Sequence, residues 1–257
     1  MDPPFLKDLR DTDFAYQQYR AAVDCVDYTV GRITELPRFA QGVIAFTADH
    51  GESFGQEGVW WDHAELFPSS THVPLLLNYP GAPAGTVVDM AVRQIDVGHT
   101  LLDLAGHEDK EFPGRDLSAA AQGSLDSEAF FGLAAHGMSA YLYSGNLHMI
   151  LHLRFHKEWS FEHDGRFEHE IKLYDVVSDP ECAINLVNVN TKQAHAMRKA
   201  LVKWLVSAPA HGLGRERNMT NDQRDHLRQL GYVENEMSEG ALIDPECACD
   251  NCAPYRD

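Results

Sequence analysis

The chain has 257 residues, of which 44% are hydrophobic, and a formal net charge of −18 at pH 7. This length can bury the core of one large domain or two small ones, and the negative charge argues against nucleic-acid binding, which needs Lys and Arg against phosphate. No run approaches the roughly 18 apolar residues of a membrane span, and no signal-peptide pattern follows Met1, so we expect no membrane span and leave localisation open, with the cytoplasm as the default.

The N-terminal part is predicted to be a mixed α/β region. An amphipathic helix is predicted from Asp13 to about Leu36, because apolar residues recur at helical spacing. The apolar run 43–47 follows and indicates a buried parallel strand. After a long loop over 50–72, a second strand is predicted from Val73 to Leu77 and a helix from Asp96 to Leu104.

Pro113-Gly114 and the small, polar stretch 118–128 indicate a boundary, and from Phe130 to Tyr174 the pattern changes to strands. Apolar residues alternate over 147–155, which predicts a half-buried strand in a small antiparallel sheet. A helix is predicted from about Lys192 to Val206. Residues 236–257 are predicted to form a disordered tail. The predicted domains are therefore residues 1–115, residues 116–235 and the tail.

Five histidines follow one another in this strand region: His148, His152, His156, His163 and His169. The first three would share one face of the predicted strand. At roughly 3.3 Å per residue, neighbours would lie about 13 Å apart, which is too far for one metal ion. We therefore predict a solvated strand face.

Asp49-His50-Gly51 places two potential metal ligands directly after the first strand. In open α/β sheets, ligands bind beyond the carboxyl ends of the strands. A carboxylate oxygen and an imidazole nitrogen can both take a divalent cation, and Gly51 lets the backbone leave the strand sharply. The alternative is an Asp-His-Gly turn that only ends the strand.

Several motifs occur in a characteristic order: Tyr19–Arg32, Asp49–Gly55, Trp60–His63, Ser70–Leu77, Val92–Val97, Lys172–Asp175, Asp179–Glu181, Asn185-Leu186 and His226–Val233. This order resembles the C-terminal half of the sulfatase family of the alkaline phosphatase superfamily, over about residues 15 to 235. The resemblance implies a partial alkaline-phosphatase-like α/β sheet with helices. A small antiparallel sheet plus helix would follow as a C-terminal subdomain.

The resemblance also implies site residues. Asp49 and His50 match the family's second pair of metal ligands. His63 lies near the position where the family places a Lys or His against the sulfate, so it is expected to bind substrate; the alternative is a loop histidine beside Trp60 and Trp61. The implied cofactor is a divalent metal, with calcium preferred and magnesium or manganese as alternatives. No catalytic residue is assigned.

The family's other half carries a Cys-x-Pro-x-Arg motif, whose Cys becomes the formylglycine nucleophile. This chain resembles only the second half, so we expect a fragment or split enzyme that is inactive without a missing N-terminal half. The implied function is metal-dependent hydrolysis of sulfate esters. The alternatives are a phosphonate or phosphate ester hydrolase of the same superfamily, and a non-catalytic truncated or pseudoenzyme module.

The chain has five cysteines, three of them in the predicted tail: Cys247, Cys249 and Cys252. A closed structural zinc site needs four ligands, so a fourth ligand would have to come from elsewhere, and an unstructured tail is the preferred interpretation. Cys252–Arg256 also fits Cys-x-Pro-x-Arg, which we interpret as coincidence. Cys25, within the first predicted helix, is expected to be buried.

Overall fold

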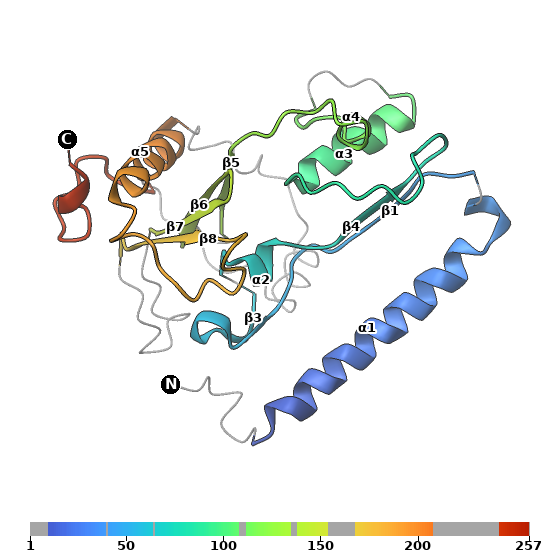
Figure 1. Ribbon diagram of the computed structural model, residues 1–257, viewed down its shortest axis with the longest axis horizontal. Helices are drawn as coiled ribbons and strands as arrows, with labels where there is room; N and C mark the ends of the chain where they lie inside the picture. Colours follow the sequence, from blue (N-terminus) through green and yellow to red (C-terminus); the bar gives the residue numbers. More distant parts are fainter. Residues whose placement is uncertain are drawn as a thin grey trace, which may run out of the picture. The chain divides into compact units, whose positions relative to one another are not determined.

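The computed structural model describes residues 10–39, 41–63, 65–107, 112–134, 138–153, 168–207 and 242–256. The chain divides into two compact units, described separately below. The N-terminal unit comprises Asp2–His63 and Pro68–Ala129, and the C-terminal unit comprises Ala64–Phe67 and Phe130–Asp257. Both units combine helices with short strands (Figure 1), which confirms the predicted α/β class. Within the described ranges, no helix is long and apolar enough to cross a membrane.

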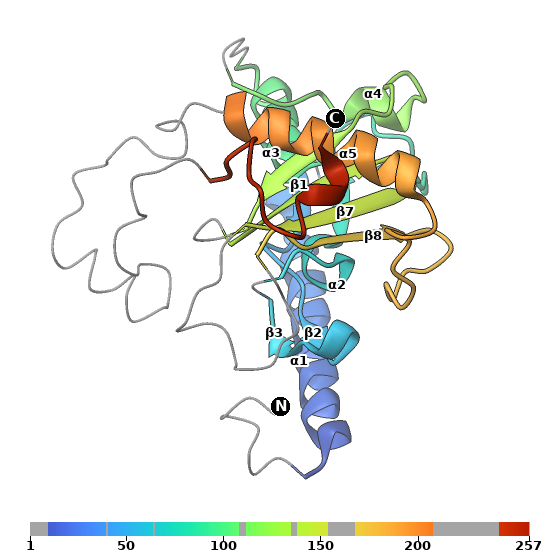
Figure 2. The ribbon, with the colours of Figure 1, turned by 90° about the vertical axis from the view of Figure 1, so that its left-hand side faces the viewer.

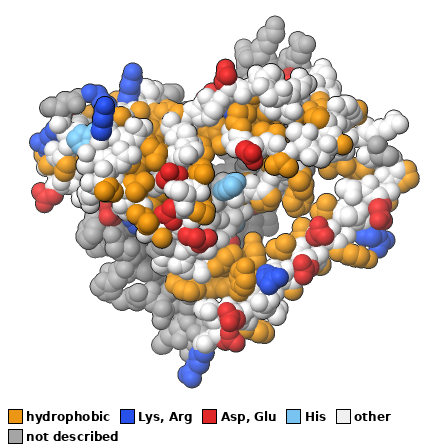
Figure 3. All heavy atoms as spheres, in the orientation of Figure 1, with side chains coloured by type: hydrophobic (Ala, Val, Ile, Leu, Met, Phe, Trp, Pro, Cys, Tyr) orange, Lys and Arg blue, Asp and Glu red, His pale blue; other side chains and the backbone are white. Residues whose placement is uncertain are grey.

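The first predicted helix is present as α1 (Thr12–Thr34). It begins at Asp11, whose carboxylate accepts a hydrogen bond from the Phe14 backbone N–H at 3.1 Å and so caps the helix. None of the residues of α1 is buried, and Figure 3 shows apolar side chains along its surface. Cys25 is exposed, so the prediction of a buried thiol was wrong: helical spacing identifies an apolar face but not what covers it.

The two predicted strands of the N-terminal unit pair with each other. β1 (Ile44–Thr47) runs antiparallel to β4 (Leu75–Asn78), with Ile44 opposite Asn78 and Thr47 opposite Leu75. The expectation of a buried parallel strand was therefore wrong. Among the described residues no third strand joins this pair, and Leu76 is 65% exposed. A parallel strand needs covered faces on both sides, which this pair lacks.

The rest of the N-terminal unit consists of short elements. A hairpin of β2 (Ser53–Phe54) and β3 (Trp60–Asp62) encloses the 3-10 helix η3 (Gln56–Gly58). Phe54 packs edge-on against Tyr16 and Tyr19 of α1, with ring centroids 5.3 and 4.8 Å away. The remaining elements are the 3-10 helix η2 (Pro37–Phe39), α2 (Pro68–Thr71), α3 (Gln94–Leu104) and α4 (Ser118–Ala121).

The buried carboxylate of Asp96 fixes α3. It accepts hydrogen bonds from the backbone N–H groups of Arg93, at 2.9 Å, and Arg115, at 3.0 Å. The Arg93 guanidinium lies 2.9 Å from it as well. Burial raises the pKa of Asp96, but the hydrogen bonds and charge of Arg93 outweigh burial and lower it below its ordinary value. A buried carboxylate held this way caps the helix and ties the segment before α4 to it.

The C-terminal unit contains the predicted antiparallel sheet. Its strand order is β5-β6-β7-β8, and every neighbouring pair is antiparallel. The predicted helix is α5 (Thr191–Ser207), which lies along one side of this sheet (Figures 1 and 2). Apolar side chains between α5 and the sheet form the core, among them Met149, Leu151, Leu173, Met197 and Leu201. The strands are β5 (Phe130–Leu133), β6 (Ser139–Ser144), β7 (Leu147–His152) and β8 (Ile171–Asp175).

The histidine face of β7 is buried rather than solvated. His148 and His152 are only 3% and 4% exposed. His148 Nε2 donates to the Leu66 carbonyl oxygen at 2.7 Å, and Phe67 packs against Tyr174. The predicted solvated face was wrong because a segment more than 80 residues upstream covers it. His156 and His163 lie outside the described residues.

The end of the chain packs onto α5. Residues 242–256 form turns and the 3-10 helix η5 (Ala253–Tyr255). Ile243 is 3% exposed and belongs to the core, and the Tyr255 ring lies 4.7 Å from the His195 ring. The prediction of a disordered tail was therefore wrong for these residues, because their few apolar side chains are enough to pack against α5. The motif His226–Val233 lies outside the described residues.

Candidate functional site

Asp49 and His50 lie directly after β1, in a loop held from two directions. The Gly51 backbone N–H donates to the Ser70 carbonyl oxygen at 2.9 Å. The side-chain amide of Gln94, on α3, donates to the carbonyl oxygen of Ala48. A Cβ atom at position 51 would collide with the Ser69 carbonyl oxygen. Glycine is therefore required at position 51 for close approach of the backbone.

The side chains of Asp49 and His50 converge. His50 Nδ1 lies 2.8 Å from the Gly51 carbonyl oxygen. Since that oxygen can only accept, Nδ1 carries the proton, and Nε2 of the neutral ring is left with its lone pair. Nε2 lies 3.8 Å from Asp49 Oδ2. Two bonds of about 2.1–2.4 Å from one divalent cation span this gap, so the two side chains fit a shared metal ion.

The structure brings His63 to the same place. Its ring stacks on the His50 ring with centroids 3.8 Å apart and planes inclined by 11°. His63 Nδ1 lies 3.4 Å from Glu52 Oε2, which orients the ring. The proximity of His63 to the Asp-His pair agrees with the sequence analysis, while the roles of all three residues remain predictions. Nothing in the sequence indicated the ring stacking.

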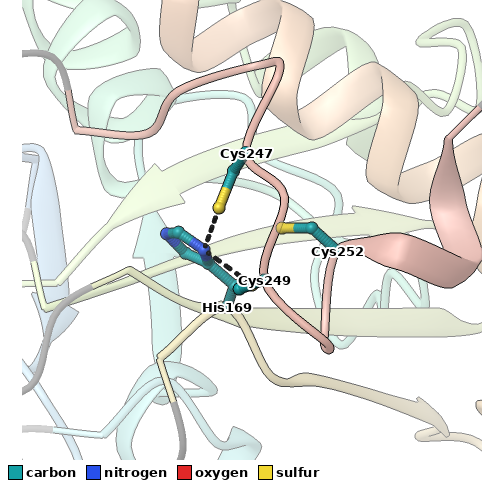
Figure 4. Close-up of side chains that lie close together, drawn as sticks. All are labelled: His169, Cys247, Cys249 and Cys252. Carbon is teal, nitrogen blue, oxygen red and sulfur yellow. Dashed lines mark hydrogen bonds between the residues drawn. The ribbon is translucent and has the colours of Figure 1, made fainter.

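A second group of potential ligands lies in the C-terminal unit. Nδ1 of His169 and the thiols of Cys247, Cys249 and Cys252 all lie within 4.8 Å of one another (Figure 4). Burial raises the pKa of the Cys249 thiol, but hydrogen bonds, foremost with His169, lower it to about 7; burial raises that of Cys252 to about 12. The close spacing of the three thiols is visible in the sequence, but His169 lies 78 residues before Cys247, so no local pattern joined it to them.

Comparison with known proteins shows a likeness to sulfatases. Residues 7–107, which contain the Asp-His-Gly loop and His63, match the sulfatase family. Arylsulfatase K of Danio rerio is 41% identical over 64 residues, or 25% of this chain and 12% of that protein. The N-acetylglucosamine-6-sulfatase of Homo sapiens is 31% identical over 93 residues, or 36% of this chain and 17% of that protein. Residues 7–107 are therefore a sulfatase-like segment of this chain. The stretch that matches is less than a fifth of the length of either relative.

A solved structure extends the likeness to the fold. A protein determined in complex with its substrate, D-glucosamine-2-N,6-O-disulfate, superposes with a TM-score of 0.57 at 20% identity. The superposition covers 70% of this chain and 38% of the other protein. It confirms the expected alkaline-phosphatase-like fold, of which the described residues form a part.

Proposed function

We propose that the loop from Asp49 to His63 is the metal- and sulfate-binding part of a site that hydrolyses sulfate esters. The observation that carries the proposal is the convergence of Asp49 Oδ2, His50 Nε2 and the His63 ring directly after β1. This convergence falls within the segment that matches the sulfatase family. Charged and metal-binding groups in one place can stabilise the negative charge of a sulfate ester in its transition state.

Asp49 and His50 would hold one divalent cation. Calcium is our first choice, because hard cations prefer oxygen ligands and keep water in the remaining positions; magnesium and manganese are the alternatives. When bound, the cation supplies positive charge that polarises a sulfate oxygen. The Gly51 carbonyl fixes the His50 tautomer, and Gln94 holds the Ala48 carbonyl, so both ligands are oriented before the metal binds.

His63 would bind the sulfate group. In its protonated form it can donate a hydrogen bond to a sulfate or ester oxygen and offset negative charge there. Glu52 Oε2, 3.4 Å from Nδ1, fixes the orientation of the ring. Stacking on His50 keeps the ring beside the proposed metal ligands.

The substrate class we propose is a sulfated amino sugar of the glycosaminoglycan type, a proposal supported by the name of the N-acetylglucosamine-6-sulfatase relative. The residues described above stabilise charge but do not attack sulfur. Ser53, the hydroxyl-bearing residue of the Asp49–His63 loop, is fully buried, and its Oγ lies 2.7 Å from Ser69 Oγ. We therefore expect no useful turnover of an aryl sulfate by this chain alone.

Manganese binding tests the proposal. Mn²⁺ is the probe, because thiolates disfavour it and the cysteine cluster would not compete. We expect a dissociation constant on the order of 10⁻⁴–10⁻³ M, as for cation sites with few protein ligands, measured by electron paramagnetic resonance titration. Asp49→Asn should weaken binding at least about tenfold. Asp89→Asn, which changes an exposed carboxylate of the same unit, should bind as the wild type does.

Sulfate binding in the presence of Mn²⁺ tests His63 separately, by calorimetry with inorganic sulfate. His63→Gln should weaken sulfate binding and leave Mn²⁺ affinity unchanged. Equal Mn²⁺ affinity in wild type and Asp49→Asn would refute the metal site. Equal sulfate affinity in wild type and His63→Gln would refute the substrate-binding role.

A further inference from the structure

We propose that His169, Cys247, Cys249 and Cys252 bind one structural Zn²⁺ ion, which fastens the end of the chain to the antiparallel sheet of the C-terminal unit. The four side chains come from two segments: the turn before β8 and the terminal segment that packs on α5 (Figure 4). This site is separate in residues and in chemistry from the loop of Asp49 and His50.

The spacing of the ligand atoms fits a tetrahedral ion. His169 Nδ1 lies 3.3 Å from Cys247 Sγ and 3.4 Å from Cys249 Sγ, and all four ligand atoms lie within 4.8 Å of one another. Zn–S bonds of about 2.3 Å and a Zn–N bond of about 2.0–2.1 Å place tetrahedral ligands about 3.6–3.8 Å apart. The observed separations bracket that value, so binding needs only small side-chain movements.

The ligand set selects zinc and a structural role. Three thiolates with one imidazole are soft ligands that suit Zn²⁺ and disfavour calcium, magnesium and manganese. Four protein ligands leave no open position for water or substrate, which is the pattern of structural rather than catalytic sites. Cys249 and Cys252 have two residues between them, as zinc-binding cysteine pairs commonly do.

A buried cation supports the site from outside the ligand shell. Arg198 of α5 is only 6% exposed, and its Nη2 donates to Cys252 Sγ at 3.0 Å. A zinc ion with three thiolates has a net charge of −1. The Arg198 guanidinium offsets this charge, so the buried arginine and the anionic centre stabilise each other.

The backbone at His169 is in a costly conformation. Its φ is +63°, in the left-handed region that a residue with a Cβ rarely adopts. Its backbone N–H donates to the His152 carbonyl oxygen at 2.7 Å, which holds the turn at the end of β7. This strained backbone conformation directs the imidazole toward the three thiols. Ligation of a metal is a function that explains why the strained conformation is retained.

Few buried side chains hold the terminal segment. Apart from Ile243 and Cys252, its described residues are at least partly exposed. Binding of a metal to the folded chain adds folding free energy to that of these contacts. Zinc would therefore strengthen the attachment of a terminal segment that only a few apolar side chains hold.

Zinc content is the first test. The full chain is expressed with zinc, purified without chelators and analysed for metals by mass spectrometry. We expect one Zn²⁺ per chain, with zinc affinity reduced at least tenfold in Cys249→Ser and in His169→Asn, measured by chelator competition. Asn tolerates the left-handed backbone of position 169, so this variant removes the imidazole without adding strain. Cys25→Ser, at an exposed thiol outside the cluster, should retain zinc fully.

Zinc-edge X-ray absorption identifies the ligands. The wild type should show three sulfur ligands at about 2.3 Å and one nitrogen at about 2.0 Å. His169→Cys should retain zinc and show four sulfur ligands, which separates loss of a ligand from loss of folding.

Three results would overturn the proposal. The first is a chain that holds no zinc and takes up none when it is added. The second is unchanged zinc affinity in both Cys249→Ser and His169→Asn. The third is covalent use of the thiols, seen by peptide mass spectrometry as a disulfide among the three cysteines or as an aldehyde at Cys252. None of these results bears on Mn²⁺ binding at Asp49.

Discussion

Asp49, His50 and Gly51 have different roles at the proposed sulfate-ester site. Asp49 and His50 present an oxygen and a nitrogen 3.8 Å apart. Gly51 has no side chain, but its backbone sets the geometry of both neighbours. Its N–H group donates to the Ser70 carbonyl oxygen, and its carbonyl oxygen fixes the His50 tautomer. Residue types alone therefore identify the ligands, whereas their orientation depends on backbone contacts with residues almost twenty positions later.

Gly51→Ala is expected to destabilise the chain and weaken Mn²⁺ binding. The new Cβ would meet the Ser69 carbonyl oxygen, and overpacking against backbone costs about 1–3 kcal/mol. Gly31→Ala is the matched control, because a Cβ at this position of α1 meets no atom within 4 Å. Gly31→Ala should raise the free energy of unfolding by up to about 1 kcal/mol, because Ala favours the helix more than Gly does. Urea denaturation and Mn²⁺ titration check both variants; Gly51→Ala behaving as Gly31→Ala would contradict the close approach.

Two helices of similar pattern differ in what they contact. α5 buries six side chains: Ala194, Met197, Arg198, Leu201, Val202 and Leu205. α1 is longer and has an apolar stripe at the same spacing, yet none of its residues is buried. Periodicity establishes that a segment can be a helix with an apolar face. The free energy that the face contributes depends on the partner that covers it.

Truncation of one side chain in each helix should separate these cases. Leu201 is 0% exposed. Leu201→Ala should lower the free energy of unfolding by about 2–5 kcal/mol, because truncation of a core side chain leaves a cavity. Val26 is 50% exposed, so Val26→Ala should change the free energy of unfolding by no more than about 0.5 kcal/mol. Equal losses in denaturant unfolding would show that α1 is covered in solution.

For the molecule as a whole, two buried histidines make stability depend on pH. Burial lowers the pKa of His148 to about 4; burial, together with the charge of Lys172, lowers that of His152 to about 4. The ordinary value, about 6.5, applies in the unfolded chain. Between pH 6.5 and 4 the unfolded chain binds protons that the folded chain does not, so stability falls as the pH is lowered through this window and loses nothing further from these groups below it.

Replacing both histidines by Gln should therefore flatten the pH profile. Between pH 7 and 5 the pair should contribute a loss on the order of 3 kcal/mol, since one pKa unit corresponds to about 1.4 kcal/mol. In the double variant this pH-dependent loss should be absent. The variant should still be less stable than the wild type at pH 7, because the buried contacts of the two histidines are removed. His72→Gln, at an exposed histidine, is the control. The free energy of unfolding is measured by denaturation at pH 7 and pH 5. If it fell as much in the double variant as in the wild type, neutral burial of His148 and His152 would be contradicted.

The sequence by itself determined the three longer helices, three of the eight described strands, the resemblance to sulfatases and the Asp49-His50-Gly51 loop, because these depend on local periodicity and on residues adjacent in the chain. Only the tertiary structure decided the antiparallel pairing of β1 with β4, the burial of His148 beneath Leu66, and the meeting of His169 with the terminal cysteines. Each of these joins segments far apart in sequence. Local pattern gives a segment its conformation and its faces, but which distant segment covers a face, or completes a set of ligands, is settled by packing of the whole unit.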